Sequence, residues 1–125
     1  MRLVFDTGAL IALERGNPEM WRRWAASARS DRVPLTHGGV IGQAWRSGPR
    51  QARLARALPG IDVLPLDEKL GRAAGELMRR AATADVVDAA VVALAVDGDQ
   101  IYTSDVGDIE HLAAVRGVEV RIIGV

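Results

Sequence analysis

The stretch LVFDTGALIAL, residues 3–13, places an aspartate between two apolar runs. Leu3–Phe5 predicts a short buried strand, and Ala9–Glu14 predicts a helix. Asp6 therefore stands at the carboxyl end of a strand, directly before a helix. The same order of strand, aspartate and helix recurs in IYTSDVGDI, residues 101–109.

Strands and helices alternate along the rest of the chain. Further strands are predicted at Val33–Thr36, Ile61–Leu66, Gln100–Thr103 and Val118–Ile123. Further helices are predicted at Pro18–Ala28, Val40–Arg46, Gln51–Leu58, Asp67–Ala82, Asp85–Val96 and Ile109–Arg116. This alternation predicts a three-layer α/β/α fold with a central parallel sheet of four to five strands. Ligands of such sheets bind beyond the carboxyl ends of the strands.

The composition excludes several classes of protein. The 125 residues fit one domain, and 49% hydrophobic residues are too many for a disordered chain. There is no cysteine, which excludes disulfides, a thiol nucleophile and Cys-ligated metal sites. The longest apolar run, Ala89–Val96, is too short for a membrane span, and the N-terminus is a poor signal peptide. We therefore expect a cytoplasmic protein with no membrane partner.

The zero net charge divides into two unlike halves. Residues 1–58 hold ten Arg against four acidic residues, whereas residues 59–125 hold six basic against twelve acidic residues. This asymmetry indicates an anionic partner on one side and a cation site on the other, although chance and a solvated surface would also explain it.

Three aspartates are candidates for the cation site. Asp6 and Asp105 follow two strands, so they reach the same sheet edge if the strands are parallel. The alternative for each is an N-cap of the next helix. Asp88 lies in ADVVDAAVVALAV, residues 84–96, a helix apolar on all sides and therefore expected to be buried. A carboxylate there needs a hydrogen bond, an ion pair or a metal.

No lysine or arginine occurs from Thr83 to Glu110 to pair with Asp88. Asp85, three residues earlier, lies on nearly the same face and is a further candidate for the cation site, with helix capping as its alternative. Converging carboxylates resist ionising together, and a divalent cation relieves this repulsion. Ligation by oxygen alone favours Mg²⁺ or Mn²⁺, and such sites commonly hydrolyse phosphodiesters.

The segments LVFDTGALIAL, ADVVDAAVVALA and IYTSDVGDI, in this order, resemble a PIN domain, specifically the VapC toxins of bacterial toxin–antitoxin pairs. The resemblance covers essentially the whole chain and implies a single PIN-like domain, residues 1–125. It implies a Mg²⁺- or Mn²⁺-dependent endoribonuclease toxin that cuts RNA, commonly tRNA or ribosomal RNA, and so inhibits translation. It also implies a VapB-like antitoxin partner and a homodimer.

The resemblance assigns residues position by position. Asp6, Asp88 and Asp105 match the catalytic, metal-binding aspartates. The supporting positions are Thr7, Gln43, Asp85, Thr103 and Asp108. Asp108 could reach the metal through water or lie at the surface without a role.

Gln43 is a departure from this pattern. The family usually has a glutamate where the segment GGVIGQAWRSG, residues 38–48, has Gln43. Glutamine is neutral and offers one carbonyl oxygen, so we expect weaker metal binding and slower or absent catalysis. The alternative function is therefore a catalytically attenuated PIN-like module that binds RNA or its antitoxin.

Four arginines are candidates for RNA binding. Arg46, Arg50, Arg53 and Arg56 would share one face if a helix continued through them, although Gly48-Pro49 interrupts its first turn. Such a face can bind phosphates, or it can be an ordinary solvated surface.

The remaining distinctive residues favour structural roles. Trp21, Trp24 and Trp45 are expected in the core or a subunit interface, with base stacking as the alternative. His37 and His111 are expected at the surface or as helix caps. A phosphorylation-type receiver domain, which also has an acidic Mg²⁺ pocket, is disfavoured because the only lysine is Lys69, at a helix start.

Overall fold

A computed structural model describes residues 1–125. Its strands are β1 (Leu3–Phe5), β2 (Leu35–His37), β3 (Asp62–Leu64), β4 (Gln100–Thr103) and β5 (Arg121–Gly124). Its helices are α1 (Thr7–Glu14), α2 (Pro18–Arg29), α3 (Gly38–Ala44), α4 (Ala52–Ala57), α5 (Glu68–Ala81), α6 (Val86–Leu94) and α7 (Val106–Arg116). Two 3-10 turns, η1 (Pro49–Gln51) and η2 (Leu58–Gly60), flank α4.

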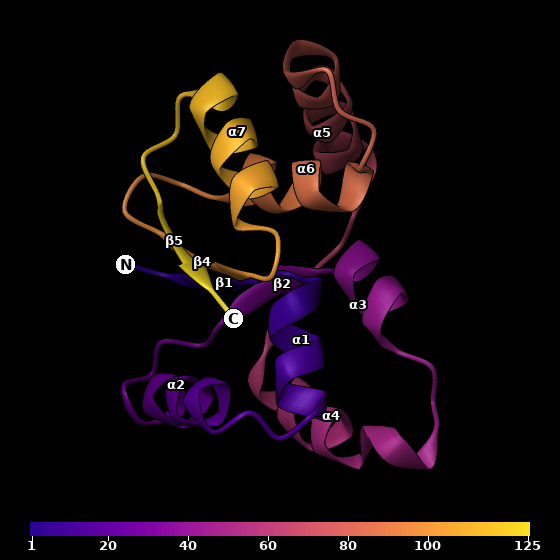
Figure 1. Cartoon of the computed structure of the whole chain (residues 1–125), viewed down its shortest axis with the longest axis vertical. Helices are drawn as coiled ribbons and strands as arrows, with labels where there is room; N and C mark the ends of the chain where they lie inside the picture. Colours follow the sequence, from indigo (N-terminus) through magenta and orange to yellow (C-terminus); the bar gives the residue numbers. More distant parts are fainter.

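The five strands form one sheet in the order β3-β2-β1-β4-β5, and every neighbouring pair is parallel. Helices α1, α2 and α4 lie on one side of the sheet, and α5, α6 and α7 lie on the other (Figure 1). The predicted three-layer α/β/α architecture with a parallel sheet is therefore confirmed.

The strand order places a topological switch between β1 and β4. From β1 the chain proceeds outward through β2 to β3, then returns to add β4 and β5 on the opposite side of β1. Adjacent strands that diverge in this way leave a crevice at their carboxyl ends, which is where open α/β sheets bind ligands. Asp6 and Asp105 follow these two strands.

The core fills both faces of the sheet. Phe5 and Tyr102, paired in register on β1 and β4, make an edge-to-face contact with ring centroids 5.6 Å apart. On the other side of the core, six of the nine residues of α6 are buried, in line with its apolar sequence. None of the helices is both long and apolar enough to cross a bilayer.

Two tryptophans of α2 form hydrogen bonds to the neighbouring helices α1 and α4. The indole N–H of Trp21 donates to the Leu13 carbonyl at 3.0 Å, and that of Trp24 donates to the Ala57 carbonyl at 3.1 Å. Their rings are partly buried against the core and lie edge to face. Trp21, Trp24 and the partly buried Trp45 therefore pack against the core. This position agrees with the expected structural role rather than with base stacking.

Element ends differ from the predicted ones for local reasons. The α1 helix starts at Thr7 rather than Ala9 because the Asp6 side chain accepts from the Thr7 N–H and caps it. The predicted helix Gln51–Leu58 shortens to Ala52–Ala57, with a proline-containing 3-10 turn on each side.

Candidate metal centre

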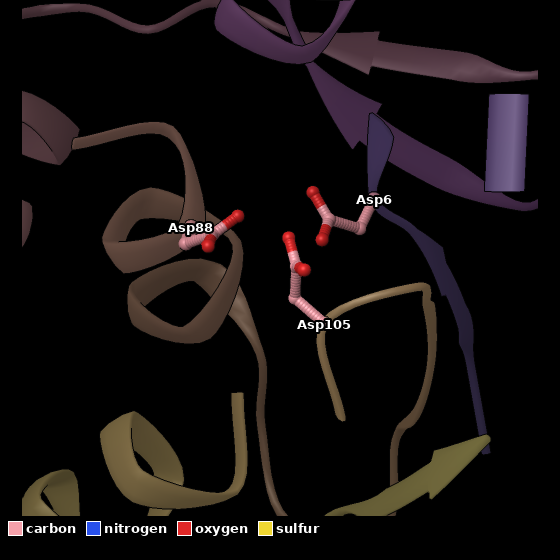
Figure 2. A group of neighbouring side chains, drawn as sticks. All are labelled: Asp6, Asp88 and Asp105. Carbon is pink, nitrogen blue, oxygen red and sulfur yellow. The ribbon is translucent and has the colours of Figure 1, made fainter. Parts of the chain in front are cut away.

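Three carboxylates converge beyond the carboxyl ends of β1 and β4. Asp6, Asp88 and Asp105 each offer an oxygen, and these oxygens lie within 4.8 Å of one another. The side chains come from the end of β1, from the first turn of α6 and from the turn after β4, and they point toward a common centre (Figure 2).

Asp6 is oriented by two donors. Its Oδ1 accepts the Thr7 backbone N–H at 2.7 Å, and its Oδ2 accepts the Thr103 hydroxyl at 2.8 Å. The residue is buried, and this burial raises the pKa of its carboxyl although both hydrogen bonds oppose the rise. Asp6 therefore caps α1 and also faces the cluster, so its capping role does not exclude the metal-binding role expected for it.

Asp105 is exposed and keeps its carboxylate free. It occupies the N-cap position of α7 but makes no side-chain capping bond. Its backbone N–H donates instead to the Thr103 hydroxyl oxygen at 2.9 Å. The Thr103 hydroxyl thus ties Asp6 and Asp105 together while it is itself fully buried.

Asp88 has the most perturbed carboxyl of the cluster. Burial, followed by the negative charges of Asp6, Asp85, Asp105 and Asp108, raises its pKa to about 7. No salt bridge compensates this buried charge. A cation in the cluster would offset both the burial of this charge and the repulsion from its neighbours, and would therefore lower the pKa.

Two further acidic residues border the cluster. Asp85 caps α6, because its Oδ1 accepts the N–H groups of Val87 and Asp88 at 3.0 and 3.1 Å. It thereby shapes the turn that carries Asp88. Asp108 lies exposed in the first turn of α7 and acts on Asp88 through its charge.

The three carboxylates fit a divalent cation. All donors are oxygen, two of them are buried, and no protein cation neutralises them. Mg²⁺ and Mn²⁺ favour this donor set over the nitrogen and sulfur ligands typical of zinc.

Gln43 lies next to this cluster. The Thr7 hydroxyl donates to Gln43 Oε1 at 2.6 Å, so the amide oxygen is already engaged by the residue that follows Asp6. The Gln43 amide nitrogen has no protein partner, and the residue is exposed. The first turn of α1 and the end of α3 are therefore joined at the edge of the cluster.

His37 caps α3 and also forms a hydrogen bond to α6 that the sequence did not reveal. Its Nδ1 accepts the Gly39 N–H at 3.0 Å, as a cap of α3, and its Nε2 therefore donates to the Val87 carbonyl at 3.0 Å. Burial lowers the pKa of the ring. His37 is fully buried, so the expected surface position is wrong and the capping role is correct. Since its partner is Val87, His37 joins α3 to the turn that carries Asp88.

The four arginines do not share one helix. The α3 helix ends at Ala44 before Arg46, Arg50 lies in η1, and only Arg53 and Arg56 belong to α4. Arg46 and Arg50 line one hollow, and Arg53 and Arg56 line another beside Trp21. The condition for a single face, one helix through all four arginines, is not met, because the extended backbone at Trp45 and the Gly48-Pro49 turn break the helix.

The fold and the cluster together define a class of protein: a three-layer α/β domain with an acidic site at the carboxyl edge of its parallel sheet. No family model matches the sequence, and no curated protein is significantly similar to it. Among solved structures, this chain is similar to a protein chain of the VapBC2 crystal structure from Rickettsia felis, in which VapBC2 is bound to a DNA fragment from its promoter. The TM-score is 0.68 over 98% of each chain at 10% identity, which establishes a shared fold.

Proposed function

We propose that this protein is a metal-dependent endoribonuclease toxin of the VapC type. The observation that carries the proposal is the convergence of the Asp6, Asp88 and Asp105 carboxylate oxygens within 4.8 Å at the switch point of the sheet. Fold likeness to a chain of a VapBC2 structure supports the same class. Mg²⁺ or Mn²⁺ is the proposed cofactor.

Each residue of the proposed site has a distinct role. A bound divalent cation supplies neutralisation of the carboxylates and Lewis acidity toward a phosphate oxygen and the attacking water. Thr7 N–H and the Thr103 hydroxyl fix the Asp6 oxygens in advance, as outer-shell donors commonly do. With a pKa of about 7, Asp88 is about half protonated at neutral pH in the metal-free protein, and cation binding would favour release of that proton.

The substrate and partners follow from the same proposal. Hydrolysis breaks the bond between phosphorus and the 3′ oxygen, which leaves a 5′-phosphate and a 3′-hydroxyl. RNA used in translation, tRNA or ribosomal RNA, is the proposed substrate, and this action would take place in the cytoplasm. The arginines of residues 46–56 supply positive charge for the RNA backbone. A VapB-like antitoxin is a proposed protein partner, in line with the VapBC2 structure. A second copy of the chain is proposed as a further partner.

Cleavage of end-labelled RNA tests the proposal. Purified protein, freed of any antitoxin, is incubated with RNA in Mg²⁺, in Mn²⁺ or in chelator. We expect cleavage only with metal, products ending in 5′-phosphate, and a loss of about a hundredfold in Asp6→Asn. No cleavage under any of these conditions, or equal cleavage by Asp6→Asn, would contradict the proposal.

Gln43 favours a second candidate, a PIN-like module that binds RNA or antitoxin with little cleavage. The site carries three carboxylates rather than four, and the amide oxygen of Gln43 is occupied by Thr7. This candidate predicts metal-independent RNA binding by native protein and no cleavage until Gln43→Glu restores the carboxylate.

A further inference from the structure

A hollow of about 390 Å³ lies between α1 and the segment that joins α3 to η1. Its lining includes three arginines, Arg15, Arg46 and Arg50, and one acidic residue, Glu14. None of these arginines forms an ion pair. The hollow is therefore a concave surface with excess positive charge, and Glu14, its one carboxylate, forms no ion pair with these arginines.

A buried side chain builds this hollow. Gln51 accepts the backbone N–H groups of Arg46 and Ser47 at 2.7 and 2.9 Å, and it donates to Glu14 Oε1 at 2.6 Å and to the Ala44 carbonyl at 2.7 Å. These four bonds hold the connecting segment against α1. They also engage the one carboxylate of the lining, so that Glu14 is oriented by Gln51 rather than by an arginine.

The hollow and the carboxylate cluster lie along the same pair of helices. Thr7 and Gln43 join α1 to α3 at the edge of the cluster, and Ile11, one turn further along α1, lines the hollow. Arg15 follows one turn later, about 12 Å along the helix from Thr7. A few nucleotides of single-stranded RNA span such a distance.

We propose that Arg15, Arg46 and Arg50 form a phosphate subsite for the RNA strand whose scissile phosphate lies at the carboxylates. This inference rests on the proposed function and adds to it a fixed second point of contact, which sets the register of the RNA. The phosphodiester is the ligand that fits, because arginine forks bind phosphate oxygens through paired hydrogen bonds. Arg53 and Arg56 lie in a different hollow and do not belong to this subsite.

Equilibrium RNA binding in chelator tests the subsite without requiring cleavage. The probe is a single-stranded RNA of about twelve nucleotides, and its affinity is measured across a range of salt concentrations. For a double variant, Arg15→Gln with Arg50→Gln, we expect about tenfold weaker binding and a salt slope reduced by about 1.

Two control variants make the result specific. Arg29→Gln with Arg32→Gln removes the same charge from exposed residues at the end of α2, which lies across α1 from α3 (Figure 1), and should leave affinity and slope nearly unchanged. Arg15→Lys with Arg50→Lys should keep the slope and lose part of the affinity, because lysine lacks the planar fork.

Each outcome bears on one claim. Native protein that binds the RNA through the hollow but cuts nothing in Mg²⁺ would refute the nuclease function and leave the subsite standing. Equal affinity and slope in native and Gln variants that circular dichroism shows to be folded would overturn the subsite, whatever the cleavage result. Selective loss of binding to a protein partner, with RNA affinity unchanged, would also overturn it.

Discussion

The Thr103 hydroxyl donates a 2.8 Å hydrogen bond to Asp6 Oδ2, which joins residues ninety-seven positions apart at the ends of adjacent strands. The same hydroxyl oxygen accepts the Asp105 N–H at 2.9 Å. One buried side chain thereby sets the distance between two carboxylates of the cluster. Thr103 is a positioning residue, since it acts on the site through Asp6 and Asp105.

Replacing this hydroxyl tests its role. Thr103→Val keeps the shape of the side chain but leaves Asp6 Oδ2 without its donor, so we expect a loss of about 1–3 kcal/mol in the free energy of unfolding. Affinity for Mn²⁺ should fall about 10–100-fold. Thr103→Ser retains the hydroxyl and should restore metal affinity. Equal Mn²⁺ affinities in the Val variant and the native protein would show that Thr103 serves folding alone.

Stability of the metal-free protein should depend on pH through Asp88. The pKa of its carboxyl is about 7 in the folded protein and about 3.9 in the unfolded chain. The folded state therefore holds more protons between these values, and stability contributed by this residue falls as pH rises from about 4 to about 7. Urea denaturation in chelator measures this dependence.

Asp88→Asn isolates the contribution of this residue, because other carboxylates titrate in both proteins. Above pH 7 in chelator, the variant should be more stable than the native protein, and the difference should vanish near pH 4. Mn²⁺ should stabilise the native protein more than the variant. If the difference in stability between the native protein and the variant does not change with pH, the pKa of Asp88 is not raised in the folded protein.

Much of this site was predictable because it depends on local order. A strand followed by an aspartate places Asp6 at a sheet edge, and the parallel topology brings Asp105 to the same edge. An apolar helix with one carboxylate marks Asp88 as buried. These inferences need only short windows of sequence and the general rule for parallel sheets.

The remaining contacts join distant segments and have no local signal. His37 donates to Val87, fifty residues away, because α6 packs over the end of β2. Arg15, Arg46 and Arg50 line one hollow because Gln51 forms hydrogen bonds both to Glu14 of α1 and to the segment after α3. The spacing of the four arginines gives one face only in a continuous helix, and the break at Gly48-Pro49, which the sequence does show, separates them in the structure.

Gln43→Glu should convert the neighbouring amide into a fourth carboxylate. The Thr7 hydroxyl can still donate to the new side chain, so the contact between α1 and α3 is retained. We expect 10–100-fold tighter Mn²⁺ binding and faster RNA cleavage, together with lower stability in chelator from added repulsion. Ala114→Glu adds the same charge at an exposed position of α7 and should leave Mn²⁺ binding and RNA cleavage unchanged. Unchanged metal binding would place Gln43 outside the metal centre.

Gly8 permits the close approach of the two aspartate-bearing turns. A Cβ atom at this position would lie 2.6 Å from the backbone nitrogen of Ser104, the residue before Asp105. Gly8→Ala should therefore push α1 away from the turn after β4, destabilise the fold by about 1–3 kcal/mol and weaken Mn²⁺ binding. Thermal denaturation and metal titration measure both effects.

Gly71 offers a matched control for this change. It lies in α5, where a Cβ atom would meet no other atom within 4 Å, so Gly71→Ala should stabilise the protein by about 0.5–1 kcal/mol and leave metal binding unchanged. Similar effects from both substitutions would show that the contact with Ser104 does not constrain the cluster.

The central claim is that Asp6, Asp88 and Asp105 jointly bind a divalent cation. Calorimetric titration of Mn²⁺ into the native protein, Asp88→Asn and Asp62→Asn tests it most directly, since Asp62 is an exposed aspartate of β3 and none of the three clustered carboxylates. The account predicts saturable binding to the native protein and to Asp62→Asn, and at least about tenfold weaker binding to Asp88→Asn. Equal affinity in all three proteins, or no binding to the native protein, would contradict it.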